Sequence, residues 1–223
     1  FGLVDFVSVQ HSSFVHVVFG SPFEVMVKKN NGMIHEVDIR PQARKVQYVQ
    51  NKNVITFTLD KPQYLSVEFN GDRLHNLHLF ANPMETETYS EEEKGVMYFG
   101  PGVHRPKDLP NNQIRIPGNT TVYLAPGAVV KAKLLLDNVE NVRIIGRGIL
   151  DHPVRGIEIT DSKNIVIDGI SVGKPDHNTV FGGGAEGATI KNLKSFSCKG
   201  WSDGIDMMCC HDVLIDNVFM RNS

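Results

Sequence analysis

The peptide NIVIDGI, residues 164–170, decides the fold, because related peptides recur along the chain at a nearly constant interval. They are NVRIIG at 141–146, GATIKNL at 187–193 and DVLIDNV at 212–218. The matching isoleucines are spaced 23, 23 and 25 residues apart: Ile144, Ile167, Ile190 and Ile215. Each peptide alternates apolar with polar residues and then places Gly or Asn where the chain must turn. One such strand cannot bury its apolar face alone, so we expect the units to stack.

Two repeat architectures have a period of this size. A leucine-rich repeat requires Leu at fixed offsets and a helical half-repeat, and the sequence has neither. Short β-branched strands with Gly or Asn corners instead favour a parallel β-helix. We therefore predict that residues 91–223 form the first coils of a parallel β-helix. From about residue 115 onward, the four isoleucines should stack in one interior column.

The first 90 residues show a different pattern. Longer alternating runs cover 14–19, 23–28, 54–59 and 64–69. The peptides Asn30-Asn31-Gly32 and Asn70-Gly71-Asp72 are hairpin-turn signals. Regularly spaced strands with such turns predict an antiparallel β-sandwich in residues 1–90. The polar segment 85–94 is expected to be a linker or a solvated loop between the two all-β domains.

The bulk composition permits two domains and argues against several classes of function. A chain of 223 residues can bury a sizeable core. A formal net charge of −2 gives no electrostatic argument for a nucleic-acid partner. No apolar run approaches the length that spans a membrane. The chain begins at Phe1 rather than Met, so we expect a processed or trimmed start. The oligomeric state stays open.

The cysteines and paired histidines are interpreted as structural. Adjacent strand residues point to opposite faces, so Cys209 and Cys210 are expected to fill space inside and outside a coil rather than bind a metal. Together with Cys198 they make an odd number, which does not indicate a compartment. His75 and His78 are expected at the surface or on an edge strand. No metal site is predicted.

The motif that carries chemistry is WSDGID, residues 201–206. Carboxylates on one face of a stacked-strand scaffold commonly cleave glycosidic bonds. Ser-Asp-Gly is also a common β-turn sequence, but the surrounding repeat favours a functional Asp203. Asp206 is the second candidate. Other features are expected to be structural: Asp212 and Asp216 as solvated outer positions, Asp151 and His152 as a coil corner, and Gly182-Gly183-Gly184 as a wide turn that leaves a cleft open.

Residues 95–223 resemble the right-handed β-helix glycoside hydrolases of the polygalacturonase and dextranase type, which have the pectin-lyase-like fold. The peptide TVYLAPGAVVK at 121–131, followed by IIGRGILD at 144–151, is similar to their opening coils. The peptide SDGID at 202–206 is similar to their Asn-Thr-Asp-Gly motif, with Trp201-Ser202 in place of Asn-Thr. A sandwich ahead of the helix is similar to the dextranase arrangement. The resemblance implies a secreted or periplasmic bacterial enzyme.

The same resemblance implies an inverting hydrolysis of an α-linked polysaccharide or oligosaccharide, without a cofactor. It implies that Asp203 helps to activate water, with Asp206 as a further catalytic candidate and Trp201 and Lys199 as substrate-binding residues. The family's Asp-Asp pair would fall directly after Ser223. The chain is therefore expected to hold only part of the site and to be inactive alone.

Two rival functions stay open. A polysaccharide lyase on the same fold would need several carboxylates in one calcium shell, and only Asp203 and Asp206 lie close enough in sequence. In an adhesive or carbohydrate-binding β-helix, Asp203 would be a corner residue. The charge of the substrate, galacturonan or neutral glucan, is also open. Lys174 and Lys199 are possible bases in the cleft, although a solvated lysine is the simpler interpretation of each.

Overall fold

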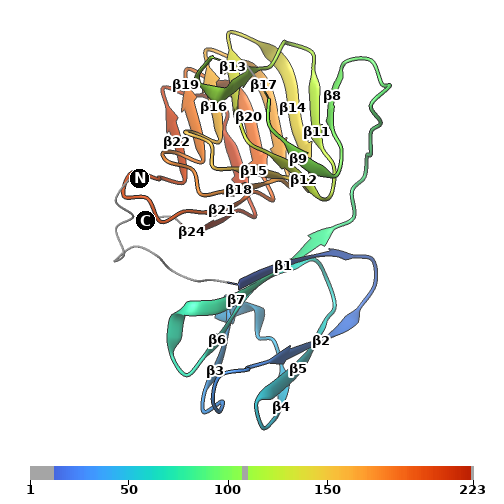
Figure 1. Cartoon of the computed structure of the whole chain (residues 1–223), viewed down its shortest axis with the longest axis vertical. Helices are drawn as coiled ribbons and strands as arrows, with labels where there is room; N and C mark the ends of the chain where they lie inside the picture. Colours follow the sequence, from blue (N-terminus) through green and yellow to red (C-terminus); the bar gives the residue numbers. More distant parts are fainter. Residues whose placement is uncertain (1–12, 107–109, 222–223) are drawn as a thin grey trace. The chain divides into compact units, whose positions relative to one another are not determined.

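A computed structural model describes residues 13–106 and 110–221 (Figure 1). The chain divides into two compact units, Phe1–Glu85 and Thr86–Ser223. Regular structure in the described residues is β-strand, apart from two short 3-10 turns at Gln42–Arg44 and Pro110–Asn112. The predicted all-β class is confirmed.

The first unit is a sandwich of two sheets. The four-stranded sheet has the order β1 (Ser13–Phe19), β7 (Asp72–Pro83), β6 (Gln63–Phe69) and β3 (Val37–Arg40). The three-stranded sheet has the order β2 (Phe23–Lys28), β5 (Val54–Leu59) and β4 (Tyr48–Asn51). Ile55 and Leu59 from one sheet share a buried core with Val67 and Leu79 from the other. The pairing is antiparallel except between β1 and β7, which run parallel.

One of the two predicted hairpin turns is confirmed, and the other is wrong. Asn70 and Gly71 join β6 to β7 with φ angles of 59° and 73°, as a two-residue hairpin turn requires. The prediction at Asn30-Asn31-Gly32 is wrong, because the strands on either side of it, β2 and β3, belong to different sheets. A turn sequence specifies that the chain reverses locally, but it does not specify which sheet the next strand joins.

The second unit is a β-solenoid, in which strands from successive coils stack into three parallel sheets (Figure 1). Sheet I contains β8 (Val96–Phe99), β11 (Thr121–Leu124), β14 (Glu140–Gly146), β17 (Lys163–Asp168), β20 (Glu186–Lys191) and β23 (Leu214–Asp216). Sheet II contains β9 (Gly102–His104), β12 (Ala128–Val130), β15 (Ile149–Asp151), β18 (Ser171–Gly173), β21 (Lys194–Phe196) and β24 (Phe219–Arg221). Sheet III contains β10 (Gln113–Arg115), β13 (Lys133–Asp137), β16 (Ile157–Thr160), β19 (Val180–Gly183) and β22 (Ile205–Met208).

The predicted isoleucine column is confirmed in sheet I. The register pairs Ile144 with Ile167, Ile167 with Ile190, and Ile190 with Ile215. The first three side chains have no exposed surface, whereas Ile215 is 45% exposed, because β23 is the outermost strand of sheet I in the described residues. Full burial of each such side chain stabilises the fold by about 1.5–3 kcal/mol. The column therefore fixes the register of the coils.

The corners of the coils use residues that tolerate left-handed backbone. At the corners after β13, β16, β19 and β22 of sheet III the φ angles are 52° at Asn138, 44° at Asp161, 70° at Gly184 and 53° at Cys209. Asn, Asp and Gly adopt this conformation at the lowest cost. At a neighbouring corner, the Asn164 amide donates to Asn141 over 2.7 Å, and Asn141 donates to Asn119 over 3.0 Å. These ladders satisfy polar side chains from one coil to the next.

The segment 84–95 contains no strand, as expected, but part of it is bound to the solenoid. The Arg143 guanidinium in β14 donates to both Glu87 oxygens, over 2.7 and 2.9 Å. Tyr89 packs beside Tyr123 with ring centroids 5.5 Å apart. The hydrogen bond from Arg143 lowers the pKa of Glu87 to about 2. Glu87 is exposed and Tyr89 is half-buried, and the side chains of both contact residues of sheet I.

Candidate functional site

The outer face of sheet III brings polar and aromatic residues of successive coils into register. Because side chains alternate along a strand, burial of Ile157 and Ile159 turns Glu158 outward. Phe181 in β19 and Asp206 in β22 occupy the same row, since the register pairs Glu158 with Phe181 and Phe181 with Asp206. We define the site face by this row and the residues beside it: Lys133, Arg155, Glu158, Phe181, Asp203 and Asp206.

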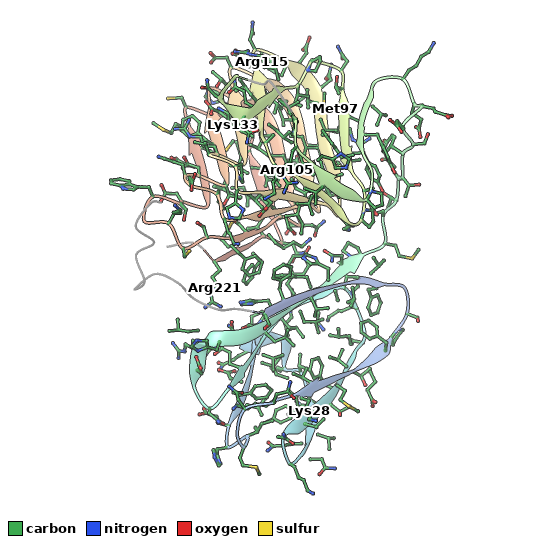
Figure 2. The ribbon with its side chains drawn as sticks, viewed as in Figure 1. Lys28, Met97, Arg105, Arg115, Lys133 and Arg221 are labelled. Carbon is green, nitrogen blue, oxygen red and sulfur yellow. The ribbon has the colours of Figure 1, made fainter. Side chains whose placement is uncertain are left out.

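Two cations on the site face share one carboxylate. Lys133, which Figure 2 labels, places its Nζ 2.8 Å from Glu158 Oε2. Arg155 Nη1 lies 3.2 Å from the same oxygen. Partial burial acts to raise the pKa of Glu158, but the bonds from Lys133 and Arg155 outweigh it and hold that pKa below its usual range. The Arg155 guanidinium also lies over the Phe181 ring, 4.5 Å from its centroid.

These residues were missed by the sequence reasoning, which found the motif of the last coil but not its neighbours. Lys133, Glu158 and Phe181 are separated by more than twenty residues and carry no motif of their own. The missing signal is the repeat itself. When the buried positions of the repeats are aligned, one residue of each coil falls on the same outer row. The alignment then shows which outward side chains of successive coils are neighbours.

A tight turn presents the predicted substrate-binding residues. The Ser202 N–H donates to Lys199 O over 3.1 Å, and the Ser202 hydroxyl donates to the same oxygen over 2.7 Å. Ser202 itself is buried, whereas Trp201 in the centre of the turn is 77% exposed. Lys199 Nζ lies 3.4 Å from Asp176 Oδ1. The turn therefore holds a large aromatic ring in solvent, immediately before the two candidate carboxylates.

Asp203 lies two residues before β22, the last strand of sheet III in the described residues, and Asp206 lies within that strand. The backbone carbonyl of Asp203 accepts the Thr179 N–H over 3.0 Å, which anchors this position to the preceding coil. The Asp203 residue is exposed, and Asp206, the second residue of β22, is half-buried. Among residues 13–106 and 110–221, β22 is the outermost strand of sheet III. The described residues thus place Asp206 on the outward row of the site face and Asp203 in the turn that leads into β22.

The expectation of a wide turn at Gly182-Gly183-Gly184 is wrong. Gly182 and Gly183 belong to strand β19, and only Gly184 occupies a corner, with φ of 70°. A Cβ at Gly182 would lie 2.6 Å from the sulfur of Met207. The glycine is therefore required by the packing of the next coil inside the solenoid rather than by a cleft.

The remaining candidates have structural surroundings. Asp212 and Asp216 are exposed, as predicted, and His152 has the left-handed φ of a corner, 52°. Cys209 is exposed, whereas Cys210 packs against the core, which agrees with their assignment. His75 Nδ1 lies 2.9 Å from Asp72 Oδ2 at the surface.

The expectation for His78 is wrong, because this residue is buried and lies in the four-stranded sheet between β1 and β6. Its ring stacks with Phe80, with centroids 6.2 Å apart. Within the part of the chain that the structure describes, no group of three or more His, Cys, Asp or Glu residues could hold a metal ion. No helix in the same residues is long and apolar enough to cross a membrane.

Comparison with known proteins gives distant likenesses to solved structures. No family model matches the chain, and no curated protein does. A solved structure of a candidate glycosyl hydrolase from Parabacteroides merdae is similar with a TM-score of 0.36 and 11% sequence identity. The match covers 57% of this chain and 84% of that chain.

Proposed function

We propose that this chain belongs to a carbohydrate-active enzyme, a glycoside hydrolase whose site lies on the outer face of sheet III. The observation that carries the proposal is the outward position of Asp206 in β22, with the exposed Asp203 and the exposed ring of Trp201 in the turn that precedes this strand. A carboxylate that projects from a strand of a stacked sheet, as Asp206 does in β22, is held in position without support from a loop. The exposed aromatic ring in the preceding turn offers a flat apolar surface to the C–H face of a sugar.

The proposed reaction is hydrolysis with inversion. An inverting enzyme needs one protonated carboxyl group on the leaving oxygen and one ionised carboxylate behind a water, roughly 6.5–9.5 Å apart. Strands of neighbouring coils are about 4.8 Å apart, so carboxylates on adjacent coils with a small offset meet this requirement. We assign to Asp203 the activation of the water. The carboxyl group that protonates the leaving oxygen would come from a coil stacked on β22. A close second carboxylate would also raise the pKa of the acid.

We assign different roles to the two predicted substrate-binding residues, Trp201 and Lys199. Trp201 is assigned to a sugar ring, because its side chain is exposed and its turn is fixed by both bonds to Lys199 O. Lys199 is already paired with Asp176, so its charge is not free for an anionic substrate. We propose that the Lys199–Asp176 pair supports the turn.

The test is substitution of the two carboxylates in the natural protein at its full length. Asp203→Asn keeps the shape of the side chain and removes its charge, so the melting temperature should stay within a few degrees of the parent. Loss of a group that activates water should lower kcat by about 10²–10⁴. Asp212→Asn makes the same change in charge at an exposed corner beside β23 and should leave kcat unchanged.

Several outcomes would contradict parts of this assignment. If Asp206→Asn abolishes turnover while Asp203→Asn does not, the roles of the two residues are exchanged. If neither substitution changes kcat but both lower the melting temperature, Asp203 is a turn residue and the proposed site is wrong.

A further inference from the structure

The sandwich unit has a groove on the outward face of its three-stranded sheet, in which β2, β5 and β4 lie side by side (Figure 1). Because Ile55 and Phe57 of β5 are buried in the core, alternation turns Thr56 to the opposite face. The groove over this face has a volume of about 430 Å³, within the usual range for a ligand site. We call it the sandwich groove, and its lining includes Glu24, Gln47, Tyr48, Val49, Thr56 and Thr58.

One row of residues across the groove is polar. Glu24 of β2 pairs with Thr58 of β5. Gln47 directly precedes β4, and the antiparallel register of β4 on β5 continues to place it opposite Thr58. The Gln47 amide donates to Lys45 O over 3.2 Å, which fixes the direction of this side chain. Within residues 13–106 and 110–221, the Glu24 carboxyl group and the Thr58 hydroxyl have no hydrogen-bonding partner, so both are available to a ligand.

The next row is apolar at both ends. Met26 of β2 pairs with Thr56, and Thr56 pairs with Val49 of β4. Met26 and Val49 are 69% and 72% exposed, and Tyr48, beside Val49 in the same strand, is 41% exposed. Exposed apolar groups that gather on one face commonly mark a binding surface. The sandwich groove therefore offers an aromatic ring and aliphatic groups next to a row of hydrogen-bonding side chains.

This combination fits a sugar better than a peptide or an apolar ligand. A peptide that added a strand would lie along the outer edge of β4, whereas the groove extends across the sheet to Glu24 in β2. An apolar ligand would cover Glu24 and the threonine hydroxyls without pairing them, which is costly. A sugar has a C–H face that can pack on the Tyr48 ring and hydroxyl groups that can bond to the polar row.

We propose that the sandwich groove is a binding site for a neutral oligosaccharide, separate from the site face and without catalytic chemistry. Tyr48 packs against a sugar ring, Glu24 accepts hydrogen bonds from sugar hydroxyls, and Thr58 both donates and accepts. A carboxylate accepts bonds from hydroxyl groups and repels another carboxylate, so the ligand is neutral. The groove uses no residue of the site face and therefore stands independently of the proposed function.

The experiment uses three neutral oligosaccharides as probes: maltoheptaose, isomaltoheptaose and cellohexaose. Each is titrated by calorimetry into the chain of residues 1–223, and at least one should bind. The emission of Trp201, the only tryptophan of the chain, is recorded in parallel with selective excitation. Because Trp201 belongs to the proposed hydrolase site, its emission reports binding there.

Variants of the lining residues identify where the sugar binds. Tyr48→Ala removes the ring and should weaken binding by about tenfold, whereas Tyr48→Phe keeps the ring and should bind like the parent. Glu24→Gln removes a charged acceptor and should also weaken binding by about tenfold. The controls are Val18→Ala, at an exposed apolar position in the four-stranded sheet, and Glu36→Gln, at an exposed position between β2 and β3. Both controls should bind like the parent, and melting temperatures show whether each variant is folded.

The outcomes separate this inference from the proposed function. Binding that Tyr48→Ala and Glu24→Gln weaken, and the controls do not, supports the sandwich groove. Binding that changes Trp201 emission and is unaltered in folded Tyr48→Ala would overturn the inference and support the proposed function.

A folded parent chain that binds none of the three probes would also overturn the inference, and hydrolysis by Asp203 would still be decided by Asp203→Asn in the full-length protein. If such a parent self-associates in sedimentation experiments, the face takes a second copy of the chain instead of a sugar.

Discussion

Lys194 in β21 is a lysine with no exposed surface in a chain whose other lysines mostly reach solvent. Its Nζ donates to Gly169 O over 2.9 Å. Burial, reinforced by the charge of nearby Arg147 and opposed by Asp168, lowers the pKa of Lys194 to about 7. A substantial share of this side chain is therefore uncharged at neutral pH, which makes the stability of the solenoid depend on pH above that value.

The direction of that dependence follows from the two pKa values. Between about 7 and the ordinary value of 10.5, the unfolded chain binds a proton at Lys194 and the folded chain does not. Stability from this group therefore rises with pH across that window and is lowest below pH 7. Lys194→Met should remove the slope, so the free energy of unfolding of the variant minus that of the parent should be more positive at pH 6 than at pH 10. Denaturant titrations at the two pH values measure this, and parallel pH profiles for parent and variant would contradict it.

The interior column gives a prediction at the scale of a strand. Ile167→Ala leaves a cavity between two buried neighbours and should lower the free energy of unfolding by about 2–5 kcal/mol. Ile215→Ala makes the same chemical change in the outermost strand, where the side chain is 45% exposed, and should cost less than half as much. The denaturation midpoints of the two variants provide the comparison. Equal losses would mean that β23 is as well covered as β17.

Strands whose signal is local could be predicted from the sequence, whereas contacts between coils could not. Residues 23–28 and 54–59 form strands with the predicted bounds, because alternation of side chains is visible within each run. The isoleucine column followed from the period. Gly182 was misassigned because its partner, Met207, lies one coil away, and a run of glycines resembles a turn when the next coil is ignored.

Only part of the candidate site could be predicted from the sequence, for the same reason. Asp203 and Asp206 stand in one motif, so they could be proposed directly. Lys133, Arg155 and Glu158 meet only after the coils are aligned, since Lys133 and Glu158 are far apart in sequence. The aromatic contact of Arg155 with Phe181 likewise crosses from one coil to the next. Spacing within a repeat indicates that a face exists, and the register decides which side chains share it.

At the scale of the whole chain, we propose that the boundary predicted near residue 90 separates two independently folding domains. Residues 90–95 are exposed and contain no strand, so their backbone is open to a protease. A Glu-specific endoprotease should cut first after Glu91, Glu92 or Glu93 and leave two resistant fragments. Mass spectrometry identifies the cut, and circular dichroism of each purified fragment should keep its β-sheet signal. Degradation without stable fragments would contradict the proposed boundary.

The stacking of nearly identical coils also has a mechanical consequence. Each coil of the solenoid is held by lateral pairing in three sheets, and its neighbours repeat the same pairing. Under tension applied from one end, a coil would detach as a unit, because its lateral bonds are loaded in turn rather than together. Each detachment of a 23-residue coil, the interval from Ile144 to Ile167, would lengthen the chain by up to about 80 Å. The solenoid would therefore yield in a series of similar steps, and the force at each step would report how firmly that one coil adheres to the next.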